Sequence, residues 1–286
     1  MLGAIIGDIV GSVYEWNNIK TKSFPLFRDD CFFTDDTVIS VAVADALMNG
    51  GTADDFIDAY KKWGRLYPHA GYGGQFGSWV RHRGREPYDS WGNGSAMRVS
   101  PCAWLPDCGS YAHTGLWPPM GREKARLSAE VTHNHPEGVK GALATADAIF
   151  LCRARLAGGG SGSEQVTMEQ CKLQIKEHIE REYGYDLSLS LDEIRPTYRF
   201  EGSCQRTVPQ AITAFLESTD FEDAIRNAIS LGGDSDTLAA ITGSIAEAAY
   251  GIPEEIREKA LSFLDDRLKA TYRRWCGFLR DHQDAM

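Results

Sequence analysis

Two acidic motifs, about two hundred residues apart, each stand directly in front of an apolar stretch of the chain. Each motif combines two aspartates with at least one threonine. The residues are Thr34, Asp35, Asp36 and Thr37 in the first motif, and Asp234, Asp236 and Thr237 in the second. Taken singly, either motif is explained by helix capping, since Asp and Thr are preferred N-cap residues and acids in the first turn suit the helix dipole.

The paired acids exceed what capping requires. One N-cap needs one side chain, and the adjacent Asp35 and Asp36 cannot both accept from the same amide. If the two helix starts meet, four carboxylates and several hydroxyls form an all-oxygen site of the kind that Mg²⁺ or Mn²⁺ prefers. Without a metal the same carboxylates would repel one another, and their pKa values would rise. The motifs therefore indicate a two-metal site, which by itself suggests phosphoryl transfer or hydrolysis.

The elements that must position these motifs are helices. Apolar residues recur at helical spacing over 221–229 and again over 238–248, where Gly251 and Pro253 follow as stop signals. Similar patterns predict helices over residues 2–15, 34–48, 52–63, 122–131, 137–157, 164–183 and 254–281. Convincing period-2 alternation bounded by turns is missing. We therefore predict an all-α fold, a compact helix bundle in a single domain over residues 1–286.

Three further stretches bear on the arrangement of these helices. Gly3, Gly7 and Gly11 lie on one face of the first helix, which predicts that another backbone, a packed helix rather than a ligand, comes close there. The stretch 64–121 is rich in Gly, Pro and Trp and poor in helical period, which is typical of a functional region. AGGGSGSEQ at 157–165 reads as a flexible surface loop.

Composition excludes several classes of protein. With 286 residues and 43% hydrophobic residues, the chain can bury a sizeable core. A formal net charge of −10 argues against a nucleic-acid binder. The seven cysteines form no C-x-x-C pair, so neither a disulfide framework nor a zinc site is expected, and a cytoplasmic location fits best. The N-terminal stretch carries Asp8 and reads as a folded helix rather than a signal peptide, and no membrane span is expected.

Five stretches occur in the order known from one family. They are GAIIGDIVGSVYEW, FTDDT, GNGSAMRVSP, AEVTHNHPEG and LGGDSDTLAAITGSIAEAAYG. Together they resemble the ADP-ribosylglycohydrolases, and the chain is similar to the bacterial dinitrogenase reductase-activating glycohydrolase group. The resemblance runs from about residue 2 to residue 251.

The resemblance implies an all-α domain that holds two divalent cations, usually Mg²⁺ and in some members Mn²⁺. The implied ligands are Thr34, Asp35, Asp36, Asp234, Asp236 and Thr237. Glu15 matches a glutamate that acts near the metals as ligand, gate or base, and either Glu15 or Asp36 would help to activate the attacking water. Hydrolysis at the anomeric carbon of the distal ribose would then pass through an oxocarbenium-like transition state.

The resemblance also implies an ADP-ribose site. Its expected contacts are Ser90, Trp91, Gly92, Asn93 and Gly94, together with His133. The residue types agree, because glycines let backbone amides approach a diphosphate. Trp91 would stack on adenine or ribose, or is simply a half-buried loop tryptophan. His133 would bond a phosphate or ribose, or is a satisfied core histidine.

The implied partner is an ADP-ribosylated protein or a small molecule that contains ADP-ribose. ADP-ribosyl-arginine is favoured as the linkage, with serine-linked ADP-ribose and O-acetyl-ADP-ribose as alternatives. Other readings remain open from the sequence: a metal-dependent phosphohydrolase of a nucleotide-type substrate, a non-catalytic ADP-ribose binder or crystallin-like relative, and an immunity protein against an ADP-ribosylating toxin.

Overall fold

The computed structural model describes residues 1–105, 119–157 and 166–283, and this part of the chain is built from helices. Its described residues contain no β-strand; an isolated bridge joins Gly92 to Ser203. The predicted all-α fold is confirmed. The N-terminal half contains α1 (Leu2–Gly11), α2 (Asp35–Met48), α3 (Ala53–Leu66), α4 (Gly74–Arg81), α5 (Gly94–Met97), the 3₁₀ helix η1 (Ser100–Trp104) and α7 (Pro119–Glu130). The C-terminal half contains α8 (Pro136–Ala157), α9 (Met168–Tyr183), α10 (Leu191–Ile194), α11 (Cys204–Leu216), α12 (Phe221–Ser230), α13 (Ser235–Tyr250), α14 (Glu254–Phe263) and α15 (Asp266–Gln283).

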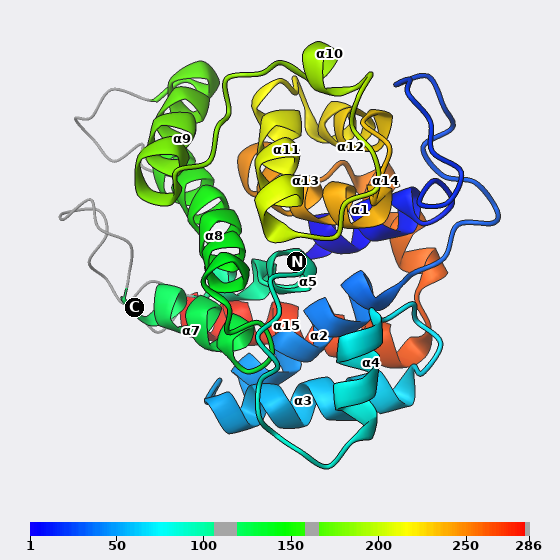
Figure 1. Ribbon diagram of the computed structural model, residues 1–286, viewed down its shortest axis with the longest axis vertical. Coiled ribbons are helices and arrows are strands. Elements are labelled where there is room, and N and C mark those ends of the chain that lie inside the picture. The colour runs from blue at the N-terminus through cyan, green and yellow to red at the C-terminus, as the bar shows by residue number, and fades with distance from the viewer. Residues whose placement is uncertain (106–118, 158–165, 284–286) are drawn as a thin grey trace.

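Helices α1 and α13 lie side by side near the centre of the molecule (Figure 1). Every residue of α1 is buried, and its glycine stripe faces α13. A Cβ added at Gly3 would lie 2.1 Å from the carbonyl oxygen of Gly243, and one at Gly11 would lie 2.4 Å from the Cα of Asp236. The stripe therefore serves close helix packing, and it brings the C-terminal end of α1 against the N-terminal end of α13.

Helix α2 is buried along most of its length because it packs against α3 on one side and α1 and α15 on others. Its apolar character all round, visible in the sequence, follows from this central position. The N-terminal ends of α2 and α13 consequently both point into the middle of the molecule, where polar side chains have few competing partners.

Two helical predictions differ from the structure. The helix predicted over 254–281 is two helices, because Leu264 is extended and Asp265 Oδ1 accepts from the backbone N–H of Leu268 at 2.9 Å, which starts a new helix. Helix α11 was not predicted; Pro209 lies inside it, and proline usually signals a helix end. The stretch 64–121 contains α4, α5 and η1 before residue 106, and the predicted loop at 157–165 lies outside the described residues from 158 onward.

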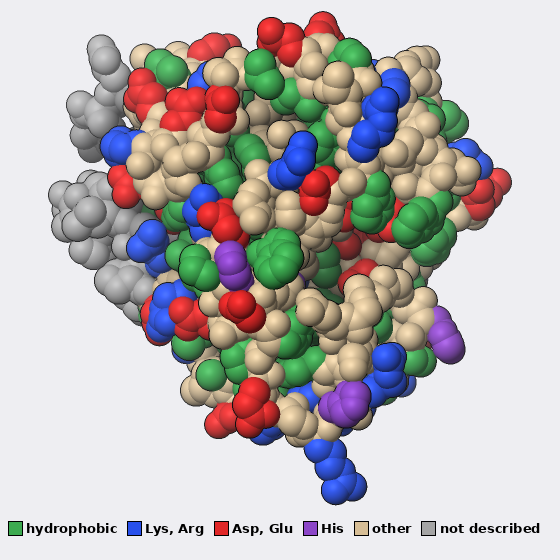
Figure 2. Space-filling model, in the orientation of Figure 1, with side chains coloured by type: hydrophobic (Ala, Val, Ile, Leu, Met, Phe, Trp, Pro, Cys, Tyr) green, Lys and Arg blue, Asp and Glu red, His purple; other side chains and the backbone are tan. Residues whose placement is uncertain are grey.

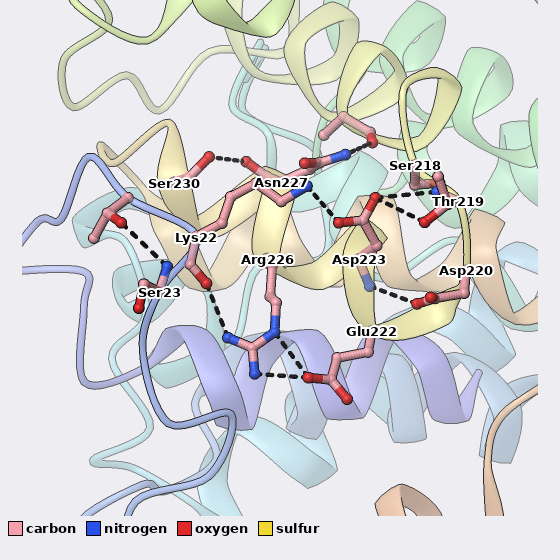
Figure 3. A network of polar contacts seen from close by, with 12 residues as sticks. Lys22, Ser23, Ser218, Thr219, Asp220, Glu222, Asp223, Arg226, Asn227 and Ser230 are labelled. Carbon is pink, nitrogen blue, oxygen red and sulfur yellow. Dashed lines mark hydrogen bonds and ion pairs between the residues drawn. The ribbon is translucent and has the colours of Figure 1, made fainter.

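The segment between α1 and α2 is fastened to α12 by a polar network (Figure 3). Arg226 donates to the carbonyl oxygens of Lys22 at 2.9 Å and Phe24 at 2.6 Å, and the Lys22 ammonium pairs with Asp223. Arg226 is itself held by Glu222, one turn earlier on α12. The contacts fix a segment that runs from Ser12 to Thr34, has no regular structure of its own and contains Glu15.

None of the described helices is long and apolar enough to cross a membrane.

Candidate active site

The starts of α2 and α13 meet. Thr34 is the N-cap of α2, and its hydroxyl lies 3.4 Å from Asp236 Oδ2 in the first turn of α13. In return, the hydroxyl of Thr237 donates to Asp36 Oδ2 at 3.2 Å. The two acidic motifs, about two hundred residues apart in sequence, thus form one polar cluster of buried side chains.

A third acid, Asp8 of α1, completes this cluster. It is fully buried and accepts three hydrogen bonds from the start of α2, from the Thr34 hydroxyl at 2.7 Å and from the backbone N–H groups of Thr34 at 2.9 Å and Thr37 at 3.0 Å. Asp8 rather than an acid of the motif itself therefore caps the second orphan amide of α2. Sequence analysis did not single out Asp8 as a site residue, although an acid alone in the apolar run GAIIGDIVG is a signal that could have found it.

The carboxylates form two overlapping groups that could hold a metal ion. Oxygen atoms of Asp8, Asp36 and Asp236 lie within 4.8 Å of one another, and so do oxygen atoms of Glu15, Asp234 and Asp236. Within the described chain, Asp36 Oδ1 and Asp236 Oδ1 are buried and have no hydrogen-bond partner. Buried, unpartnered carboxylate oxygens cost free energy, and a hard divalent cation would offset that cost. The donor set therefore fits Mg²⁺ or Mn²⁺.

Burial and like charge raise the pKa values of these acids. Burial and then the charge of Asp8 raise the pKa of Asp36, and burial followed by the charges of Asp234 and Asp36 raises that of Asp236. Burial raises the pKa of Asp8 to about 6, against the opposing effect of its hydrogen bonds. Such crowding is the expected electrostatic signature of carboxylates arranged for a cation.

Two further acids lie at the edge of the cluster. Glu15 is half-buried, and burial and the charge of Asp234 raise its pKa to about 7. Asp35 is also half-buried; burial and the charge of Asp8 raise its pKa to about 8. Asp35 lines the same cavity, but its oxygens are not part of either group of three.

The cluster forms part of the wall of a cavity of about 510 Å³, a volume within the usual range of small-molecule sites. Figure 2 shows acidic side chains inside a hollow on this face, with hydrophobic side chains along its edge. Several residues predicted to bind ADP-ribose line this cavity; they are Ser90, Gly92, Asn93, Gly94 and His133. Trp91 is exposed and lies between Ser90 and Gly92, with its ring edge-on to His135.

The glycines of this wall allow His133 to come close. A Cβ at Gly92 would lie 3.4 Å from His133 Nε2, and one at Gly94 would lie 3.2 Å from the same atom. Thr132 Oγ1 accepts from Arg98 Nη2 at 2.6 Å and lies 2.8 Å from His133 Nδ1. Because the Thr132 hydroxyl already accepts a hydrogen bond from Arg98, it is suited to donate its own hydrogen bond to Nδ1 of His133. The ring proton of His133 then lies on Nε2, which becomes the N–H donor.

His133 is neutral. Burial and the nearby charge of Arg98 lower its pKa well below the usual value. A neutral imidazole whose Nε2 faces a glycine-rich turn is a hydrogen-bond donor suited to a phosphate or ribose oxygen.

Asn93 differs from the other residues of this wall because its side chain hydrogen-bonds an acid of the cluster. Its amide donates to Asp234 Oδ2 at 2.7 Å and to Thr207 Oγ1 at 3.2 Å, and its backbone N–H donates to Gly202 O at 2.9 Å. The side chain therefore links the α5 turn to the acid cluster. Residues that sequence analysis did not name also line the cavity, among them Phe32, Phe33, Gly71 and Phe200, all from loops whose position depends on the fold.

Comparison with known proteins identifies the family. The model of the ADP-ribosylglycohydrolase family matches residues 1–280, so the chain belongs to this family and is a hydrolase of that class. The resemblance read from the five motifs is confirmed.

Named relatives span most of the chain. ADP-ribosylhydrolase ARH3 of Mus musculus is 27% identical over 92% of this chain and 86% of its own length. ADP-ribosyl-[dinitrogen reductase] glycohydrolase of Rhodospirillum rubrum is 28% identical over 84% of this chain and 76% of its own length. ADP-ribosylarginine hydrolase Tri1 of Pseudomonas putida is 25% identical over 92% of this chain and 73% of its own length. A solved structure described as an ADP-ribosylglycohydrolase-related protein complex shares the fold, with a TM-score of 0.62 and 24% identity over 95% of both chains.

Proposed function

We propose that the protein hydrolyses the bond between the distal ribose of ADP-ribose and a modified acceptor, and that it requires two divalent cations, Mg²⁺ or Mn²⁺. The observation that carries this proposal is the pair of carboxylate groups sharing Asp236 in the wall of one cavity. The opposite wall, built from a glycine-rich turn and a neutral histidine, suits a diphosphate that an acidic protein cannot bind with lysines.

The residues that would hold the cations are those at the two helix starts. They are Thr34, Asp35, Asp36, Asp234, Asp236 and Thr237. When bound, the cations supply Lewis-acid stabilisation and lower the pKa of a coordinated water. Asp8 belongs to one of the two carboxylate groups and also accepts from Thr34 and Thr37, so it would orient the start of α2 while facing the same cation.

The chain's own residues bind and orient the substrate. The backbone of the Gly92–Gly94 turn and His133 Nε2 would contact the diphosphate, and Trp91 would stack on the adenine or the proximal ribose. The distal ribose then lies at the acid cluster, with its anomeric carbon beside Glu15. This pose places the acceptor at the mouth of the cavity.

Glu15 is the carboxylate that we assign to proton transfer. It lies at the edge of the cluster and is half-buried, so water and substrate can reach it. Burial and the charge of Asp234 raise the pKa of Glu15 to about 7 in the absence of cations, and bound cations would lower it, so the carboxylate would be ionised and able to accept a proton. Asp36 is the alternative base, but it is buried and accepts from Thr237.

The acceptor that we favour is the arginine of an ADP-ribosylated protein in the cytoplasm. The names of the Rhodospirillum rubrum and Pseudomonas putida relatives support a protein or arginine acceptor, whereas the ARH3 relatives leave other linkages in play. A guanidine also leaves more readily than an alcohol, because its departure depends less on a proton donor.

The test uses the full chain and proteins carrying arginine-linked or serine-linked ADP-ribose, and O-acetyl-ADP-ribose, each with Mg²⁺, Mn²⁺ or EDTA. We expect release of intact ADP-ribose with metal and none with EDTA, and loss of turnover in Asp36→Ala and Asp236→Ala. Wild-type rates in both variants would overturn the metal-dependent mechanism. Release of AMP or phosphate would instead identify a phosphohydrolase. Tight binding of ADP-ribose without any product would identify a non-catalytic ADP-ribose binder.

A further inference from the structure

Every exposed tryptophan or phenylalanine in the described part of the chain lies at one cavity. Large exposed aromatic side chains are Trp16, Phe32, Trp91 and Phe200. Three of them line the cavity of the acid cluster, and Trp91 lies between two residues that do. Exposed aromatic side chains are costly in water and mark binding surfaces when they gather.

Two of these aromatics form a stacked pair. The rings of Trp16 and Phe200 have centroids 5.4 Å apart and planes inclined by 16°. Trp16 remains 77% exposed and Phe200 50% exposed, so the stack leaves ring faces open to solvent. Trp91 does not belong to the pair, since its ring packs edge-on against His135 instead. Trp91 thus forms one aromatic lip at the α5 turn, and the stacked pair forms a second lip, carried in part by the loop whose Gly202 accepts from the backbone N–H of Asn93.

The second lip is the acceptor side. Trp16 directly follows Glu15, whose carboxylate lies within 4.8 Å of oxygens of Asp234 and Asp236. In the pose proposed above, the diphosphate and adenine occupy the α5 lip and the anomeric carbon lies beside Glu15. The acceptor, which is bonded to that carbon, would then lie against Trp16.

We infer that Trp16 and Phe200 determine acceptor specificity by stacking on a flat cation, the guanidinium of an ADP-ribosylated arginine. This inference rests on the proposed function and names the residues that read the acceptor. A planar guanidinium stacks on aromatic faces, whereas a serine oxygen has no flat surface that could use the pair.

The charges around the pair favour a cation. Glu15 and four aspartates line the same cavity, so these five carboxylates exceed the charge of two divalent cations by one, and the chain as a whole carries a net charge of −10. The basic side chains nearest in sequence are engaged elsewhere, because Lys20 donates to the carbonyl oxygens of Tyr198 and Leu231, and Arg199 to those of Pro196 and Tyr198. They therefore leave the open face of Trp16 for a ligand.

The test compares two peptides that differ only in linkage, one with ADP-ribosyl-arginine and one with ADP-ribosyl-serine, on wild type, Phe200→Leu and Phe200→Tyr. Phe200 is the decisive position because Trp16 directly follows Glu15, so a substitution at Trp16 would also disturb the assigned base. We expect Phe200→Leu to raise KM for the arginine peptide about tenfold with little change in kcat. Phe200→Tyr, which keeps the ring face, should behave as wild type.

Three readouts decide between outcomes. Phe200→Leu should leave the serine peptide and the inhibition constant of free ADP-ribose unchanged, and Leu173→Ala, at an exposed apolar residue of α9, should change nothing. Equal losses on both peptides with weaker ADP-ribose inhibition would mean that the pair binds ADP-ribose, and would overturn the inference. So would an unaffected arginine peptide, or a wild type that cleaves only the serine linkage.

A wild type that cleaves neither peptide nor O-acetyl-ADP-ribose would refute the proposed function and leave the inference to be decided by binding. Calorimetric titration of the uncleaved arginine peptide should then show about tenfold weaker affinity in Phe200→Leu than in wild type. Equal affinities of the two proteins would overturn the inference.

Discussion

The carboxylate of Asp8 in α1 receives both the hydroxyl and the backbone N–H of Thr34, at 2.7 and 2.9 Å. One buried acid thereby fixes the N-cap of α2, which carries the first acidic motif. The site is consequently assembled from three central helices, α1, α2 and α13, rather than from loops alone. Residues that hold a cation gain precision from such rigid elements.

Removing this acceptor should damage both stability and activity. Asp8→Ala leaves three buried donors of Thr34 and Thr37 without a partner, which we expect to cost about 2–3 kcal/mol of unfolding free energy. Turnover should fall at least tenfold because the start of α2 loses its anchor. The matched control is Asp220→Ala, which removes the N-cap of α12 at an exposed site and should cost about 1 kcal/mol with normal turnover. Equal effects of the two substitutions would contradict the role of Asp8.

The glycine stripe of α1 yields a second prediction. A Cβ at Gly7 would lie 2.0 Å from the carbonyl oxygen of Ala239, so Gly7→Ala must push α1 away from α13. We expect a loss of about 1–3 kcal/mol in chemical denaturation. Gly277→Ala, in α15 with nothing within 4 Å of the added Cβ, should instead gain up to about 1 kcal/mol. If Gly7→Ala left the free energy of unfolding unchanged, the two helices would not be in contact as described.

The sequence predicted those parts of the structure that a contiguous pattern encodes. Helices such as α2 and α12 follow from apolar spacing, and the acidic motifs stand out because their residues are neighbours in the chain. Asp8 was missed as a site residue because its role depends on α1 packing beside the start of α2. Phe200 was missed because nothing local ties its loop to Trp16.

Two errors in the predicted helices have separate physical causes. Helix α11 was not predicted because Pro209 lies inside it. The missing N–H of this proline is tolerated once the surrounding helices pack. The break between α14 and α15 has no glycine or proline; it arises because Asp265 caps a new helix. Both depend on tertiary packing or side-chain geometry that periodicity does not record.

The raised pKa values predict how pH and metal act together on stability. Burial holds the pKa of Asp8 at about 6, and burial with like charge holds the pKa of Glu15 at about 7 and of Asp35 at about 8, above their usual values of 3.8, 4.5 and 3.8. The unfolded chain therefore releases protons first, and the stabilisation from these acids is complete below about pH 4 and lost as pH rises through 6 to 8.

In EDTA, the ionisation of these acids should therefore lower the Tm of the metal-free protein as the pH rises from 5 to 8. Mg²⁺ would bind the ionised form of these acids, so its addition should raise Tm more at pH 8 than at pH 5. NaCl at equal ionic strength is the control and should not reproduce the difference. A larger Mg²⁺ effect at pH 5 would contradict the arrangement of acids described here.

Asn18 is expected to position Glu15. Its amide donates to the carbonyl oxygens of Glu15 at 2.8 Å and Gly233 at 2.9 Å, and its Oδ1 accepts from the Gly233 N–H at 2.7 Å. Asn18→Ala should lower kcat about ten- to a hundredfold while the inhibition constant of ADP-ribose changes little. Asn49→Ala, which removes a similar amide bond to Asp45 at the end of α2, should leave kcat unchanged. Unchanged kcat in Asn18→Ala would show that Glu15 is held without it.

The last prediction sets activity against stability at a buried aspartate. Asp236 lies among like charges, and burial together with Asp234 and Asp36 raises its pKa, so Asp236→Asn removes a charge that the metal-free fold accommodates poorly. We expect this variant to lose turnover yet to gain about 1–3 kcal/mol of unfolding free energy in EDTA at pH 8. Asp45 is equally buried but faces Lys62 and the Trp63 indole N–H, so Asp45→Asn should destabilise the protein by a similar amount. Opposite signs at two buried aspartates would identify the Asp236 cluster as a site built for a cation, whereas destabilisation by both substitutions would make it an ordinary structural network.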